Sequence, residues 1–150
     1  MLRHLFLFLA CSISCSTISA QKNLAGLWEG VLSLKGKEYK FEILFTIPEK
    51  GRFEGKTYIY ESERDIVEAS IHGKLHQDRS MNLYDLEVSY TGPSEWVEIY
   101  KKNYQLVWHR SIFQSKLEGY WQERIPFGVN EKTKRGRIFL KKIKDDPNKV

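Results

Sequence analysis

The histidine residues are natural first candidates for chemistry, because a neutral imidazole can bind a metal ion or accept a proton. His72 and His76 are four residues apart in the sequence. On a strand this spacing places both side chains on one face, about 13 Å apart, which is too far to share one zinc ion. Gly73 and the alternation of polar and apolar residues around it favour a strand over a helix. We therefore expect no metal site at these residues.

The chain offers little for a nucleophilic or acid–base enzyme. It contains no Gly-x-Ser-x-Gly motif, and both of its cysteines lie in the first fifteen residues. A pair of carboxylates for glycoside chemistry is the other arrangement to consider, because a closed sheet brings distant residues together. Glu123 is in phase with Trp121 and is the carboxylate to inspect, although a surface charge at a strand end explains it more simply. His109 fits a core or rim position. We expect a protein without enzymatic activity, and a hydrolase of the cell envelope is the enzymatic alternative.

The first twenty residues have the three-part layout of a secretory signal peptide. Arg3 and His4 form a charged start, residues 5–10 are apolar, and small residues precede the expected cleavage after Ala20. The apolar run is shorter than the ~20 residues that a membrane-spanning helix needs. We therefore predict an exported protein, periplasmic or secreted, whose residues 1–20 are removed.

Two alternatives remain for this segment. In the first, the segment is a helix that packs on the domain. In the second, it carries a lipid on Cys11 or Cys15, whose neighbours loosely resemble a lipoprotein cleavage box. If the segment is removed, the mature chain has no cysteine and therefore no disulfide, thiolate nucleophile or cysteine-based zinc site. Its stability must then come from core packing.

Beyond the leader, apolar residues alternate with polar ones almost everywhere, which is the pattern of half-buried strands. The expected strands cover residues 24–34, 39–47, 52–62, 66–77, 81–91, 104–114, 116–124 and 136–143. A less regular piece at residues 96–100 fits a strand or a bend better than a helix. The separators are rich in Gly, Asp, Ser and Asn, which favour turns.

Short turns between successive strands favour an antiparallel meander, and eight strands close most economically into a barrel, which has no exposed edge. The expected fold class is all-β, an up-and-down antiparallel β-barrel of about eight strands over residues 21–144. A two-sheet β-sandwich is the alternative. Residues 145–150 are expected to form a flexible tail, and the length of 150 residues suits one domain.

One short motif occurs twice. Residues 24–28 and 117–121 both read Leu-x-Gly-x-Trp, so the leucine, the glycine and the tryptophan fall on one face of each strand. A glycine allows a strand to coil tightly, and a tryptophan two residues later fills the wide space at a barrel end. The repeat therefore predicts two strands that perform the same closing role.

The motif Gly26-Leu27-Trp28 and the strand order resemble the lipocalin-like, or calycin, barrels. In that family a Gly-x-Trp on the first strand closes one end, and a basic residue late in the last strand packs over the indole. The resemblance implies that Arg137 is this partner, with a cation–π contribution of about 0.5–2 kcal/mol. The residues expected to close the barrel are Gly26, Trp28, Gly119, Trp121 and Arg137.

Eight strands, this plug and abundant aromatic residues predict a binding protein that holds a small apolar or amphipathic ligand in the barrel mouth. The residues expected to line the cavity are Phe41, Phe45, Tyr58, Tyr60, Tyr84, Tyr90, Trp108 and Phe113. No cofactor is implied.

A barrel without a cavity, acting as a structural or interaction module, is the alternative function. The chain has 24 Lys plus Arg against 19 Asp plus Glu, and its last third is basic. Lys132, Lys134 and Arg135 would attract an anionic surface or a polysaccharide, unless the run is simply a solvated strand and loop. Nucleic acid is a poor partner for an exported chain that lacks an RNA-binding aromatic motif.

Overall fold

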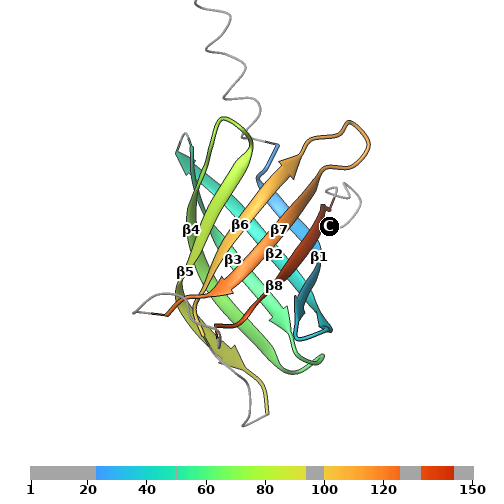
Figure 1. Cartoon of the computed structure of the whole chain (residues 1–150), viewed down its shortest axis with the longest axis vertical. Coiled ribbons are helices and arrows are strands. Elements are labelled where there is room, and N and C mark those ends of the chain that lie inside the picture. Colours follow the sequence, from blue (N-terminus) through green and yellow to red (C-terminus); the bar gives the residue numbers. More distant parts are fainter. Residues whose placement is uncertain (1–22, 50, 94–99, 126–132, 144–150) are drawn as a thin grey trace, which may run out of the picture.

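A computed structural model of the chain describes residues 23–49, 51–93, 100–125 and 133–143. These residues form a closed barrel of eight antiparallel strands, each paired with its neighbours in the sequence, with the last strand returning to the first (Figure 1). The strands are β1 (Gly26–Leu34), β2 (Lys37–Glu49), β3 (Arg52–Tyr60), β4 (Ile66–Leu75), β5 (Ser80–Thr91), β6 (Lys102–His109), β7 (Lys116–Glu123) and β8 (Arg135–Lys142). The predicted fold class, an all-β up-and-down barrel, is confirmed, and the β-sandwich is wrong.

The alternation of side chains explains why these segments form a barrel. In β6 every second residue, beginning with Lys102, is buried, and the residues between them are exposed. Successive side chains of a strand point to opposite faces, so each strand contributes one row to the interior and one to solvent. The predicted strand at 104–114 is wrong at both ends, because β6 begins at Lys102 and residues 110–115 form the connection to β7. Residues 1–20, 96–99 and 145–150, on which other predictions fall, lie outside the described residues.

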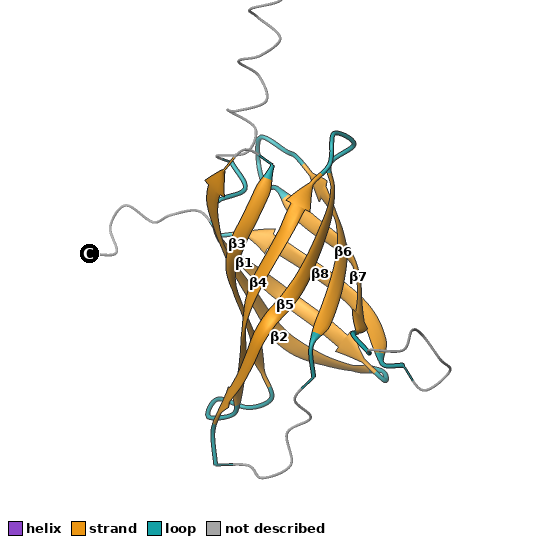
Figure 2. Ribbon diagram, turned by 90° about the vertical axis from the view of Figure 1, so that its left-hand side faces the viewer, coloured by secondary structure: helices purple, strands orange, loops and turns teal. Residues whose placement is uncertain are grey.

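The strand connections gather at two ends of the barrel (Figure 2). We call the end at which the chain enters β1 the entry end; it also carries the β2–β3, β4–β5 and β6–β7 connections and the end of β8. The opposite end carries the β1–β2, β3–β4, β5–β6 and β7–β8 connections. The two ends differ in chemistry, as the positions of the buried residues show below.

The two matched tryptophans lie toward different ends. Trp28 is near the entry end, where its indole N–H donates to the carbonyl of Leu24 at 2.9 Å, and both residues are fully buried. Trp121 is near the opposite end, where its indole N–H donates to the carbonyl of Ser33 at 2.9 Å and its ring stacks on Tyr100. The repeated motif therefore serves both ends of one barrel.

Two pairs of adjacent strands are joined by short ladders of backbone hydrogen bonds. Within the described residues the β5–β6 ladder covers Ser80 to Tyr84 of the twelve-residue β5, and the β1–β8 ladder covers Trp28 to Leu32. Polar side chains extend both. The Ser33 hydroxyl accepts a hydrogen bond from the Arg137 N–H at 2.8 Å beyond the β1–β8 ladder, and the Asp85 carboxylate accepts one from the Lys102 N–H at 2.8 Å beyond the β5–β6 ladder.

Among the described residues, no helix has the length and apolar character needed to cross a membrane.

Candidate ligand site at one end of the barrel

Four of the eight predicted lining residues face the interior. Phe41, Phe45 and Trp108 are almost completely buried and belong to the main hydrophobic cluster. Tyr90 packs against that cluster and is partly buried, and its hydroxyl donates to the carboxylate of Asp65 near the opposite end. These aromatic side chains are packed in or against the hydrophobic cluster of the interior.

The other four predicted lining residues are wrong. Tyr58 and Tyr60 alternate with the buried Thr57 and Ile59, so they face outward, and the Tyr60 hydroxyl donates to Glu42 on the outer surface. Tyr84 is 40% exposed because the inward row of β5 is Met81, Leu83 and Asp85. Phe113 is 79% exposed because it lies in the β6–β7 connection rather than in a strand.

The residues expected to close the barrel have mixed outcomes. Trp28 and Trp121 are buried at the two ends, and Gly26 begins β1 with a φ of 105°, which a residue with a side chain rarely adopts. A Cβ on Gly119 would lie 2.0 Å from the carbonyl oxygen of Gln105, so only glycine fits there. Arg137 does not pack over an indole: it is exposed, and its guanidinium lies 5.9 Å from the ring of Tyr120 on the outer face.

A buried polar cluster occupies the interior toward the opposite end. Asp85 is fully buried, and its two carboxylate oxygens accept hydrogen bonds from the Tyr104 hydroxyl at 2.9 Å and from the Lys102 N–H at 2.8 Å. The hydroxyl of Thr57, also buried, hydrogen-bonds that of Tyr104. The Asp85 carbonyl accepts from Arg124 at 3.4 Å. The cluster therefore joins β3, β5 and β6 through side chains.

Lys102 is the cation of this cluster. It is only 3% exposed, and its ammonium donates to the carbonyl of Tyr100 at 3.1 Å, the one hydrogen-bond acceptor it has among the described residues. The same ammonium lies 4.5 Å from the ring centroid of Tyr100 and 6.0 Å from that of Trp121. An ammonium has three N–H donors, and within the described residues one hydrogen bond uses them.

Burial shifts the ionisation of all three groups toward their neutral forms. Desolvation raises the pKa of Asp85 from 3.8 to about 6, against the opposing influence of the Lys102 charge and the two hydrogen bonds. Desolvation also lowers the pKa of Lys102, which Asp85, Glu61 and Glu123 oppose. The Tyr104 hydroxyl has a pKa raised well above its usual 10.0, chiefly by burial. Such perturbed groups concentrate at functional sites.

Sequence reasoning missed Lys102 and Asp85, although a signal existed for Lys102. It is in phase with Tyr104, Leu106 and Trp108, so extending the alternation by one step places a lysine inside the barrel. For Asp85 the phase is harder to find, because a bulge lies beside it, where Ala69 pairs with Val88 and Ile71 pairs with Asp85. That bulge shifts the inward row of β5.

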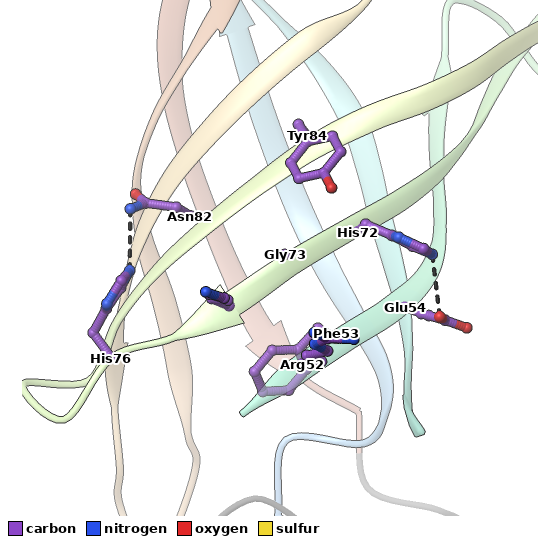
Figure 3. Close-up of a pocket in the computed structure, with 9 residues that line it drawn as sticks. Arg52, Phe53, Glu54, His72, Gly73, His76, Asn82 and Tyr84 are labelled. Carbon is purple, nitrogen blue, oxygen red and sulfur yellow. Dashed lines mark hydrogen bonds and ion pairs between the residues drawn. The ribbon is translucent and has the colours of Figure 1, made fainter. Parts of the chain in front are cut away.

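His72 and His76 lie on the outer surface, beside a groove of about 510 Å³ over β3, β4 and β5 (Figure 3). His72 pairs with Glu54 at 3.2 Å, and His76, just past the end of β4, contacts Asn82 at 3.1 Å. His109 lies 4.0 Å from Glu118. In the part of the chain that the structure describes, no three residues of the metal-binding types come together.

The remaining predicted residues lie near the opposite end. Glu123 is partly buried, and its carboxylate accepts a hydrogen bond from the Lys134 N–H at 3.2 Å. The ammonium of Lys134 lies 4.6 Å from the ring centroid of Tyr100, Arg135 is exposed, and Lys132 is outside the described residues. Two of the three predicted basic residues thus border the end that holds Lys102.

Comparison of the chain with family models, curated proteins and solved structures gave no match. The fold is consistent with a calycin-like barrel in its strand number and order.

Proposed function

We propose that the protein is a non-enzymatic binding protein that holds a small anionic amphipathic molecule at the opposite end of the barrel. The observation that carries the proposal is Lys102, a buried ammonium that has one hydrogen-bond acceptor within the described residues and lies near two aromatic rings. A buried charge costs several kcal/mol unless it is well paired. A ligand carboxylate or phosphate that accepted hydrogen bonds from this ammonium would supply that pairing.

The surroundings of Lys102 suit a ligand with an acidic head and an apolar body. Lys134 and Arg135 add positive charge at this end, which would attract an anion from solution. The stacked rings of Tyr100 and Trp121, with centroids 5.8 Å apart, offer an apolar surface beside the ammonium. The entry end offers no comparable pairing of charge and rings among its described buried residues, which are apolar.

We also propose that the chain is exported and that its barrel is lipocalin-like. Support comes from the signal-like residues 1–20 and from Gly26-Leu27-Trp28 at the start of β1. Both proposals fit a binding protein of the periplasm or the medium.

The test compares Lys102→Met with Lys101→Met in the full-length chain. Lys101 is the exposed neighbour of Lys102 and serves as the matched control. Calorimetric titration with decanoate should show binding that Lys102→Met weakens by about tenfold or more, because a charge-assisted hydrogen bond is lost. Lys101→Met should bind as the native chain does, and decanol should bind both variants equally.

Equal binding of decanoate by the native chain and by Lys102→Met would overturn the proposal. Because Lys102→Met leaves Asp85 without its cation, the double variant Lys102→Met with Asp85→Asn serves as a second test in which no buried charge is left unpaired. Circular dichroism checks that each variant is folded. Native mass spectrometry of the protein from its own source would then identify the natural ligand.

A second candidate function is capture of an acidic polysaccharide or another anionic surface through the basic residues at the same end. It is favoured by the exposure of Arg135 and the position of Lys134. Charge reversal of both residues to Glu should abolish retention on a polyanion column at low salt while unfolding remains unchanged. Retention that survives this change would exclude this function, whereas decanoate binding tests the first one separately.

A further inference from the structure

The loop between β6 and β7 carries the most exposed large apolar side chains of the described chain. Ile112 is 92% exposed and Phe113 is 79% exposed, whereas the next, Tyr120, is 58% exposed. The loop projects from the entry end of the barrel, at the upper right of Figure 1. Two adjacent apolar side chains held this far out of the fold contribute nothing to its core, and such exposed positions commonly mark an interaction site.

Positive charge surrounds this apolar tip. Arg110 is exposed at the start of the loop, and Lys116 begins β7 directly opposite Lys141 of β8. Both of these ammonium groups lie over the ring of Phe139, at 5.6 and 5.8 Å from its centroid. Like charges directly opposite each other on adjacent strands destabilise a sheet, so an anionic partner would relieve the repulsion.

Nearby acidic side chains do not neutralise these lysines. Glu29 is opposite Lys141 in the β1–β8 ladder, but its carboxylate pairs with Lys40 at 3.4 Å. Glu118, two residues after Lys116, lies 4.0 Å from His109. Within the described residues neither Lys116 nor Lys141 has a salt bridge to a carboxylate.

The chain enters and leaves the described barrel beside this loop. The Lys142 ammonium donates to the carbonyl of Asn23 at 2.6 Å, and the Lys142 N–H donates to the carbonyl of Ser115 at 3.0 Å. Ile112, Phe113 and Ile143 line one shallow surface depression there. A lipid on Cys11 or Cys15, the alternative considered for the leader, would hold this same end toward a membrane.

We propose that the β6–β7 loop is a membrane-docking tip that inserts Ile112 and Phe113 into the interface of an anionic lipid bilayer. Arg110, Lys116 and Lys141 then contact the headgroups. An apolar tip with a basic collar matches the requirements of peripheral binding, in which apolar burial and attraction to anionic lipid add together. The inference is independent of the ligand site, which lies at the opposite end.

Depth-dependent quenching of tryptophan fluorescence tests this proposal. It compares two variants that carry the same apolar residues 1–20, so membrane binding by that segment affects both equally. Phe113→Trp places a fluorophore at the tip, and Leu44→Trp places one on the outer face of β2, where Leu44 is 38% exposed. With vesicles of phosphatidylglycerol and phosphatidylcholine whose acyl chains are brominated, the fluorescence of Phe113→Trp should be quenched well beyond that of Leu44→Trp. Equal quenching of the two variants would overturn the proposal.

Charge variants test the basic collar. Arg110→Glu with Lys141→Glu should reduce partitioning onto these vesicles by about fivefold or more for each residue changed. Lys35→Glu with Lys37→Glu, at exposed positions of the β1–β2 turn and the start of β2 on the opposite end, is the matched control and should partition as the native chain does. Removal of phosphatidylglycerol should abolish the difference between the two pairs. If both pairs weaken binding equally, attraction by the net charge accounts for it and the docking tip is wrong.

Discussion

Asp85 has the burial and the hydrogen bonds to make the stability of the barrel depend on pH. Its pKa is raised from 3.8 to about 6 in the folded chain, so the folded state holds a proton that the unfolded state releases between these values. Stability must therefore fall as pH rises through this window, and the loss amounts to about 3 kcal/mol. Below pH 3.8 the contribution of Asp85 is fully present.

This dependence predicts the behaviour of Asp85→Asn. The variant should lose most of the decline in free energy of unfolding between pH 3.8 and about 6, because an amide does not titrate. Urea unfolding at a series of pH values measures the slope. Asp78→Asn is a suitable control, because Asp78 is exposed in the β4–β5 turn and its replacement should leave the decline in place. A native chain whose stability is constant across this window would contradict the prediction.

At the scale of single elements, Trp121 ties β7 to β1 across the intervening β8. Its indole N–H donates to the Ser33 carbonyl, whereas the indole N–H of Trp108 in β6 is buried without a hydrogen-bond partner among the described residues. The two tryptophans therefore form a matched pair. Replacing each with Phe removes the same volume, but only one replacement breaks a hydrogen bond.

We expect Trp121→Phe to lower the free energy of unfolding by about 2 kcal/mol more than Trp108→Phe does. The first variant leaves the Ser33 carbonyl without its donor, and the second removes an unsatisfied donor. Denaturant unfolding of both variants at one pH measures the difference. Equal losses would show that the hydrogen bond to Ser33 adds nothing to the packing of the ring.

Individual strands also show why the sequence predicted the fold better than the site. An alternation of period two identifies a strand and its two faces, and this was enough for the eight strands and their order. It does not say which face is inside when both carry large side chains. In β3, Tyr58 and Tyr60 have large aromatic side chains and Thr57 has a small polar one, yet Thr57 is the residue that is buried.

Hydropathy analysis could not find the polar cluster, because it assigns apolar residues to the interior of the barrel and charged residues to its surface. Lys102 and Asp85 occupy interior positions where pattern analysis expects apolar residues. The ammonium of Lys102 donates to the nearby Tyr100 carbonyl, and Asp85 is held by a tertiary contact with Tyr104. Phe113 shows the reverse case. It has a core-like side chain, but the closure of β6 onto β7 at His109 and Lys116 leaves it in the connecting loop.

For the whole molecule, the described residues give two short ladders in the closed barrel, β1–β8 and β5–β6, and different groups extend them. The β1–β8 ladder is extended by Ser33 at one side and by the bond from the Ile143 N–H to the Leu27 carbonyl at the other. The β5–β6 ladder has the bond from the Trp108 N–H to the Arg79 carbonyl at the entry end, and at the opposite end the bond that extends it within the described residues goes to the Asp85 carboxylate. A side chain that titrates holds two strands together less firmly than backbone hydrogen bonds do. We therefore expect β5 and β6 to separate before other neighbouring strands do.

Hydrogen exchange tests this order of opening. Amides of Lys102 and Asn103 should exchange faster than those of Phe41 to Phe45 in β2, which pairs along its length with both β1 and β3. Asp85→Asn should accelerate exchange at Lys102 further, because a neutral amide accepts a weaker hydrogen bond than a carboxylate does, while Phe41 to Phe45 keep their protection. Equal protection of amides from exchange all around the barrel would mean that the barrel opens as one cooperative unit and that Asp85 does not control the separation of β5 from β6. Faster exchange between β5 and β6 would instead connect the ionisation of Asp85 to the opening of this end of the barrel, where we place the ligand.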